Sequence, residues 1–167
     1  MTVIGKDRPG LVESVAKVIA DHGGNWLESR MCRLGGMFAG ILRAEIAADR
    51  EAPLAAALQK LSLEGLTIGV QADQPPAAKA GKFIRLEIVG QDRPGIVRQI
   101  SHALAGQGVN VEELNTECES APMSGETLFK AGAKLSVPPR CDLARLKTEL
   151  EKIAADLMVD VSLEELD

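Results

Sequence analysis

The chain has 167 residues, of which 24 are acidic and 19 are basic, so its formal net charge is −5. A protein that holds nucleic acid through its phosphates needs an excess of Lys and Arg, and this chain has the opposite balance. Aromatic residues make up 2% of the sequence, which leaves few rings for stacking single-stranded bases. We therefore expect no direct contact with DNA or RNA.

The remaining composition indicates a cytoplasmic protein without a bound metal. The three cysteines include no Cys-x-x-Cys pair and the chain has two histidines, so we expect reduced thiols, no metal and no cofactor. The N-terminus has no signal-peptide pattern, and no apolar run reaches the roughly 18 residues of a membrane span. We expect a soluble protein that makes no membrane contact.

One pattern occurs twice in the sequence. Val3–Val12 reads Val-Ile-Gly-Lys-Asp-Arg-Pro-Gly-Leu-Val, and Ile88–Val97 reads Ile-Val-Gly-Gln-Asp-Arg-Pro-Gly-Ile-Val, 85 positions later. The same offset continues downstream, where it matches Gly23, Asn25 and Glu28 with Gly108, Asn110 and Glu113. A repeat of this length predicts two copies of one small domain, at residues 1–73 and 82–167. Residues 74–81 contain two prolines and no hydrophobic periodicity, which is typical of a linker.

The first copy begins with a short strand, because only Met1–Ile4 precede Gly5. We expect this truncation to weaken the first domain, and a chain that continues before Met1 would explain it. A helix follows, then a strand from Asn25, a tight Gly35-Gly36 turn, a third strand and a second helix. Two apolar stripes at helical spacing are expected to form core: Leu11, Val12, Val15, Val18 and Ile19, then Leu54, Leu58 and Leu61.

The second copy repeats this order with a complete opening strand. Its expected elements are a strand at Phe83–Val89, a helix at Ile96–Leu104, strands at Asn110–Cys118 and Phe129–Val137, a helix at Leu143–Leu157 and a strand at Met158–Leu163. Gly106 and Gly108 should end the first helix, and Pro138-Pro139 should open the second. The order β-α-β-β-α-β predicts an α+β fold of two tandem ferredoxin-like domains, each an antiparallel sheet with its helices on one face.

The motif Gly-x-Asp-Arg-Pro-Gly lies where the first strand of each copy passes into the first helix. We expect Gly5 and Gly90 to adopt backbone conformations that other residues resist as the chain leaves the strand. Asp7 and Asp92 are expected to accept hydrogen bonds from free N–H groups of the turn. Exposed N–H groups at the positive end of a helix dipole could bind a carboxylate. The same residues would also suit a turn and cap without a ligand.

A second element, Gly-x-Asn, begins the second strand of each copy at Asn25 and Asn110. We expect it to lie beside the same end of the sheet as the motif turn. An amide there could donate to a carboxylate and accept from an ammonium, the two groups that every amino acid carries. Alternatively, asparagine tolerates a left-handed backbone just past a helix. The edge strands that begin at these residues are expected to be surfaces where domains or chains meet.

Paired β-α-β-β-α-β units that carry these two elements resemble ACT domains. From Val3 to Leu163 the chain resembles the glycine cleavage system transcriptional repressor family, which is built of two ACT domains. The resemblance implies amino-acid binding between paired domains in a homo-oligomer, with glycine as the first candidate ligand. It implies that the ligand contacts the motif turn and the start of the second strand, which in this chain are Asp7, Arg8, Gly10, Asn25, Asp92, Arg93, Gly95 and Asn110.

Three classes of function remain open. The first is an amino-acid sensor that controls transcription of glycine cleavage genes through a DNA-binding partner protein, as the resemblance implies. The second is a separate regulatory module that binds and modulates a metabolic enzyme. The third, a small α+β enzyme, has no supporting residue set, because Cys32 and Cys118 have no histidine nearby in the sequence. His22 is expected to interact with the C-terminal end of the first helix.

Overall fold

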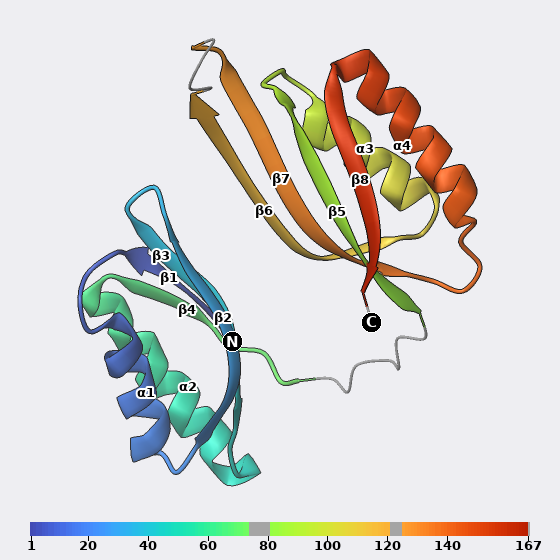
Figure 1. The fold of residues 1–167 in the computed structure, drawn as a ribbon. Helices are drawn as coiled ribbons and strands as arrows, with labels where there is room; N and C mark the ends of the chain where they lie inside the picture. The colour runs from blue at the N-terminus through green and yellow to red at the C-terminus, as the bar shows by residue number, and fades with distance from the viewer. Residues whose placement is uncertain (74–80, 121–124, 167) are drawn as a thin grey trace. The chain divides into compact units, whose positions relative to one another are not determined.

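The computed structural model describes residues 1–73, 81–120 and 125–166. The chain divides into two compact units, unit 1 (Met1–Pro75) and unit 2 (Pro76–Asp167), shown in Figure 1. The units correspond to the two copies of the repeat and are described one at a time. The predicted linker at 74–81 lies outside the described residues except for its last position.

Unit 1 is a four-stranded antiparallel sheet with two helices on one face (Figure 1). Its main elements are β1 (Thr2–Lys6), α1 (Leu11–Asp21), β2 (Asn25–Leu34), β3 (Met37–Glu45), α2 (Glu51–Lys60) and β4 (Leu66–Gly69). Two short 3-10 helices, η1 (Ala48–Arg50) and η2 (Leu61–Glu64), flank α2. The strand order β2-β3-β1-β4 places β1 in the interior of the sheet and β2 at an edge.

Unit 2 has the same architecture with longer strands. Its elements are β5 (Lys82–Gln91), α3 (Ile96–Gly106), β6 (Asn110–Ser120), β7 (Thr127–Val137), α4 (Leu143–Leu157) and β8 (Val159–Leu166). The strand order β6-β7-β5-β8 is equivalent to that of unit 1. The predicted α+β class, with two tandem ferredoxin-like domains whose helices lie on one face of an antiparallel sheet, is confirmed.

Glycines end the first helix of each unit. Gly23 and Gly108 have φ angles of 75° and 69°, in the left-handed region that side chains resist. The next amide closes the helix in both cases. In unit 1 the N–H of Gly24 donates to the carbonyl of Ile19 (2.9 Å), and in unit 2 the N–H of Val109 donates to the carbonyl of Leu104 (3.0 Å).

The second helix of unit 2, α4, has the predicted bounds, but Pro138 and Pro139 do not open it as predicted. Pro138 and Pro139 form a turn, in which the N–H of Cys141 donates to the carbonyl of Pro138 at 2.9 Å. The helix starts at Leu143, and Asp142 caps it by accepting a hydrogen bond from the N–H of Arg145 at 3.1 Å. An aspartate at the N-cap is a stronger start signal than the prolines before it.

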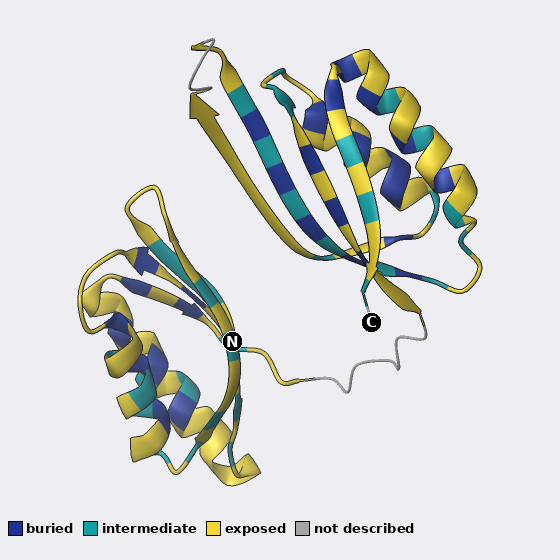
Figure 2. Cartoon of the chain, in the orientation of Figure 1, coloured by how far each residue is buried: buried dark blue, intermediate teal, exposed yellow. Residues whose placement is uncertain are grey.

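The predicted apolar stripes form most of the cores, where the helices meet the sheets (Figure 2), but Val12 is exposed and lies outside the core of unit 1. Among the described residues, 10 buried apolar residues form the core of unit 1 and 18 form that of unit 2. The difference follows the strand lengths, since β1 has 5 residues and β5 has 10. None of the helices in the described part of the chain is long and apolar enough to cross a membrane.

Replacing Leu58 by Ala should destabilise unit 1 by about 2–5 kcal/mol, because the side chain is fully buried (0% exposed). Trp26, the single tryptophan, packs against this core, so its fluorescence during urea unfolding reports on unit 1. Leu63, which is 90% exposed, gives a matched control. Leu63→Ala should change the free energy of unfolding by no more than about 0.5 kcal/mol. Equal losses for the two variants would contradict this core.

Candidate functional site

The first glycine of each motif lies inside a strand, Gly5 in β1 and Gly90 in β5, and neither has a positive φ. A Cβ on Gly5 would lie 2.7 Å from the carbonyl oxygen of Gly65, and one on Gly90 would lie 2.6 Å from the Cα of Val159. The prediction that these glycines supply unusual backbone conformations is wrong. They are required because the backbone that leads into the neighbouring strand passes too close for a side chain.

The last glycine of each motif starts a helix. Gly10 and Gly95 are the N-cap residues of α1 and α3, with φ angles of 91° and 99°, and neither helix receives a side-chain cap. The first N–H groups of each helix are therefore not satisfied by a capping side chain, and they lie at the positive end of the helix dipole. A carboxylate is well suited to this position.

The aspartates of the motif do not cap these helices, so that prediction is wrong. A capping side chain belongs to the residue just before the helix, and the aspartates lie three positions further back. The carboxylate of Asp7 instead pairs with Arg33 on β2, with 2.6 Å between Oδ2 and Nε. The backbone N–H of Asp7 donates to Gly36 (2.9 Å), and that of Asp92 donates to Thr127 (2.8 Å). These bonds tie each turn to the strand pair beside it.

The arginines of the motif differ between the two units. In unit 1, Nη2 of Arg8 lies 3.2 Å from Oε2 of Glu64 and 3.3 Å from its carbonyl oxygen. In unit 2, Nη2 of Arg93 contacts Oε1 of Gln91 at 3.0 Å and Sδ of Met158 at 3.7 Å. Neither of these partners carries a charge. The arginine of the unit 1 turn is therefore paired with an acidic side chain, whereas these contacts of Arg93 are with uncharged groups, although Asp92 lies in the same turn.

The first turns of α1 and α3 also differ in charge, and again unit 2 is the less acidic of the two units. Glu13 lies in the first turn of α1, and its carboxylate would repel an incoming anion. The first turn of α3 has no acidic residue and contains Arg98 at the third position of the helix. The N-terminus of α3 is therefore more electropositive than that of α1 and better suited to interact with a carboxylate.

The Gly-x-Asn elements lie at the other end of each sheet. Because β1 and β2 are both antiparallel to β3, they run in the same direction, and α1 returns the chain to the end where β1 begins. Asn25 pairs with Glu45, whereas Lys6, just before the turn, pairs with Met37 at the opposite end of β3. Unit 2 has the same register pattern. The prediction that Asn25 and Asn110 lie beside the turn of their own domain is wrong.

The surroundings of the two asparagines also differ. A β-bulge follows each of them, and the bulged residue is Leu27 in unit 1 and Glu112 in unit 2. The amide of Asn110 donates to Oε1 of Glu112 at 2.7 Å. A carboxylate at this position would attract an ammonium group, and a leucine would not. Neither Asn25 nor Asn110 has a positive φ, so the alternative of a left-handed asparagine is wrong.

Glu64 was not predicted as a site residue, although it neutralises the arginine of the motif turn in unit 1. Its contact with Arg8 spans 56 positions, beyond any local pattern. Aligning the two copies at their last strands, and reading from there toward the N-terminus, would have revealed Glu64. Leu66 pairs with Gly5, and Val159 pairs with Gly90, the equivalent glycine of unit 2. Two positions before these residues, Glu64 of unit 1 corresponds to Leu157 of unit 2. Only the first copy has a carboxylate there.

Residues that would suit catalysis or metal binding do not converge in the described parts of the chain. Cys32 and Cys118 are exposed and lie on different units, and burial raises the pKa of the half-buried Cys141 thiol. The described residues include no group of three or more His, Cys, Asp and Glu that could hold a metal ion. Nδ1 of His22 lies 2.8 Å from the carbonyl oxygen of Val18, which confirms the predicted role at the end of α1.

The fold and the turn together define a class of protein. Each unit is a ferredoxin-like domain whose first helix starts at a glycine without a side-chain cap. A family model described as the ACT domain matches residues 1–71 and 82–164. The chain belongs to the ACT domain family and consists of two such domains in tandem, which are ligand-sensing regulatory domains.

Individual relatives extend this picture. A protein of unknown function from Galdieria sulphuraria is 31% identical, with a TM-score of 0.88, and the match covers 99% of this chain and 96% of that one. A candidate glycine cleavage system transcriptional repressor shares the fold over 99% of this chain and 95% of its own, with a TM-score of 0.72 and 18% identity. Phosphoserine phosphatase SerB2 of Mycobacterium tuberculosis is 27% identical over 174 residues. The match covers 99% of this chain, which spans 40% of that enzyme's length.

Cys141 should react more slowly with a thiol reagent than Cys118 in dilute solution near pH 8. The thiolate is the reactive form, and burial, with a smaller contribution from Asp142, raises the pKa of Cys141. Alkylation followed by mass spectrometry of the peptides would give the two rates. Cys141→Ser should remove only the slow reaction. A fast-reacting Cys141 would contradict the burial of this side chain.

Proposed function

We propose that the chain is a regulatory protein that senses an amino acid, with glycine as the first candidate. In this proposal it modulates transcription of glycine cleavage genes through a DNA-binding partner protein. Membership of the ACT family supports ligand sensing. The fold shared with a candidate glycine cleavage repressor suggests the regulated genes. The protein is then regulatory rather than catalytic.

The charge of the turn in unit 2 is the observation that carries the proposal. Arg93 has uncharged partners, the N-terminus of α3 has no side-chain cap, and the first turn of that helix has no acidic residue. These features favour the α-carboxylate of an amino acid at Asp92–Gly95. The equivalent turn of unit 1 is occupied by the Arg8–Glu64 ion pair, so we assign the primary site to unit 2.

The second half of the site would come from another molecule of the chain. Within unit 2, Asn110 lies at the opposite end of the sheet from the turn. However, β6 is an edge strand, and antiparallel pairing with β6 of a partner reverses its direction. Asn110 of the partner subunit would then reach the end of the sheet where the turn lies. Its amide and the neighbouring Glu112 of the partner subunit would receive the ammonium group.

An apolar groove beside β6 supports this pairing. It is lined on the helix side by Val97, Ile100 and Leu104 of α3 and on the strand side by Val111 and Leu114. Val97 and Leu114 are exposed although they are aliphatic. A second molecule paired along β6 would cover the groove while its backbone completes the sheet. Ligand binding across such an interface would couple the amino-acid concentration to assembly, and assembly to partner binding.

Glycine at about 100 times its dissociation constant should raise the free energy of unfolding by roughly 2.7 kcal/mol. Arg93→Gln should remove most of this gain, because it deletes the charge that faces the carboxylate. Arg8→Gln is the matched control and should retain the gain, because Arg8 is already paired with Glu64. Gly95→Val should also abolish binding, but a φ of 99° would strain the valine backbone as well. Calorimetric unfolding with and without ligand measures these differences.

The specificity of this effect can be checked with glycinamide, which keeps the ammonium group and lacks the carboxylate. It should give no stabilisation. A titration of all twenty amino acids by calorimetry would then identify the ligand. The absence of heat and of a stability change for all of them would refute sensing by this chain alone. Equal losses in Arg8→Gln and Arg93→Gln would refute the assignment to unit 2.

The chain alone should not bind DNA specifically. It has 24 acidic and 19 basic residues, and the helix with the largest number of basic residues, α4, balances Arg145, Lys147 and Lys152 with Glu149, Glu151 and Asp156. A recognition helix needs a net positive face to reach the phosphates. Fluorescence anisotropy at about 50 mM salt would test this, and sequence-specific binding tighter than about 10⁻⁶ M would contradict it.

A second candidate function is a separate regulatory module that binds and modulates a metabolic enzyme. The observation that favours it is the match of nearly the whole chain to 40% of the length of a phosphoserine phosphatase. Affinity capture with and without glycine would separate the candidates. A transcription factor that is retained in a glycine-dependent way supports the first function, and an enzyme of amino-acid metabolism supports the second.

A further inference from the structure

The sheet face of unit 1 that points away from α1 and α2 carries a group of apolar side chains between charged residues at its ends. In β1, Val3 and Gly5 are buried on the helix side, so Thr2, Ile4 and Lys6 lie on the other side. Directly opposed residues on neighbouring strands share a face. The register therefore gives three rows, which we call the open face of unit 1: Arg30, Ile41, Thr2 and Gly69; Cys32, Ala39, Ile4 and Thr67; and Leu34, Met37 and Lys6.

Large aliphatic side chains of this face are exposed to water. The exposed fractions are 46% for Ile4, 61% for Ile41 and 79% for Leu34, and Met37 is exposed as well. The middle row, from Cys32 to Thr67, consists of four uncharged residues. A contiguous apolar patch of this kind on a small domain usually marks a binding surface.

Unit 2 shows that the fold itself does not require an apolar face. Its equivalent rows are Asn115, Gly132, Glu87 and Ser162; Glu117, Lys130, Val89 and Asp160; and Glu119, Leu128 and Gln91. The middle row carries three charged residues, and Lys130 forms an ion pair with Glu119 at 2.6 Å. The same strands in the same register thus present a charged surface in one unit and an apolar surface in the other.

We propose that two molecules of this chain associate through the open face of unit 1, sheet against sheet. Sheets pack face to face at about 10 Å, which requires side chains that can interdigitate. Small residues alternate with large ones on this face, since Ala39 and Thr67 flank Ile4. These small side chains leave room for the isoleucines of the other molecule. This association does not depend on amino-acid binding.

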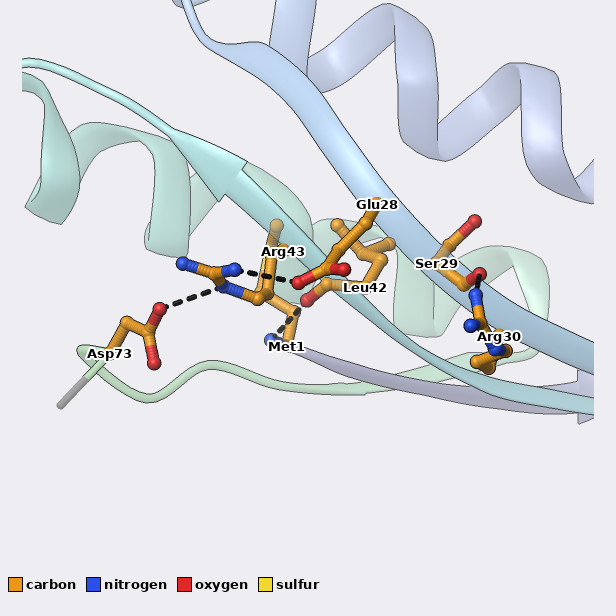
Figure 3. A network of polar contacts seen from close by, with 7 residues as sticks. All are labelled: Met1, Glu28, Ser29, Arg30, Leu42, Arg43 and Asp73. Atoms are coloured by element: carbon orange, nitrogen blue, oxygen red, sulfur yellow. Dashed lines mark hydrogen bonds and ion pairs between the residues drawn. The ribbon is translucent and has the colours of Figure 1, made fainter. Parts of the chain in front are cut away.

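The charges at the two ends of the face favour a second molecule as the occupant. At one end, Arg43 binds Glu28 at 2.6 Å and Asp73 at 2.8 Å, so this cluster has two carboxylates and one guanidinium (Figure 3). At the other end of the face lies Lys6. A two-fold axis across the strands, between these ends, would bring the lysine of each molecule to the end of the other that carries the Glu28 and Asp73 carboxylates, with Arg30 in the adjacent row. The apolar rows would then face each other.

The size of the face is sufficient for such a contact. Strands about 4.8 Å apart and rows about 7 Å apart give a sheet face on the order of 500 Å² when the charged row is included. Two such faces bury about 1,000 Å² in total, which reaches the lower limit of a specific interface. The contact would be moderate in strength, and its population would depend on protein concentration.

Analytical ultracentrifugation over a range of concentrations tests the proposal. The full chain should reach roughly twice the mass of the Ile41→Glu variant, because one charge in the apolar face prevents its burial. Val89→Glu is the matched control, since Val89 occupies the position in unit 2 that Ile4 occupies in unit 1. It should leave the mass unchanged. Circular dichroism and Trp26 fluorescence verify that each variant is folded.

A second variant keeps the test valid if Ile41→Glu does not fold. Leu34→Lys lies at the end of β2, where the side chain is mostly exposed, and it should also halve the mass. The proposal is overturned if the full chain has the same mass as a folded face variant at every concentration. It is also overturned if Val89→Glu lowers the mass as much as Ile41→Glu does.

Discussion

The parallel course of the first two strands in each unit determines where functional residues can lie. Because β1 and β2 both pair antiparallel with β3, the turn that follows β1 and the residue that starts β2 lie at opposite ends of the sheet. No side-chain rotation can remove this separation. A ligand that contacts both elements would therefore have to be bound by two domains, which is why the proposed site involves an edge strand.

The two units share one fold and one sequence repeat, but they differ in charge at three equivalent places. In unit 1 the motif arginine is neutralised by Glu64, the bulged residue is Leu27, and the open face is apolar. In unit 2 the arginine has no acidic partner, the bulged residue is Glu112, and the open face is charged. Exposed ion pairs such as Arg8–Glu64 contribute little to stability, about 0–1 kcal/mol. Their main consequence here is that the arginine of unit 1 is paired with a carboxylate and that of unit 2 is not.

The sequence was sufficient for the fold because the evidence for each element is local. The apolar stripes, the glycines after α1 and α3 and the internal repeat predicted two ferredoxin-like domains, and the structure confirms them. The site was predicted less well, because its geometry depends on contacts between distant segments. The close approach of Gly5 to Gly65 and the pairing of Arg8 with Glu64 both join β1 to the region before β4. Whether the eight predicted ligand residues bind an amino acid stays a prediction.

The contact between Arg93 and Met158 joins the turn of unit 2 to the last strand of its sheet. Met158 has a φ of 54°, a left-handed conformation that side chains resist, and it stands between the end of α4 and the start of β8. Gly90 packs directly against the backbone of Met158 and Val159. One side-chain contact and one close backbone approach therefore hold the turn of unit 2 against the beginning of β8. A substitution at Arg93 would therefore also remove a contact with the residue that precedes β8, the edge strand opposite β6.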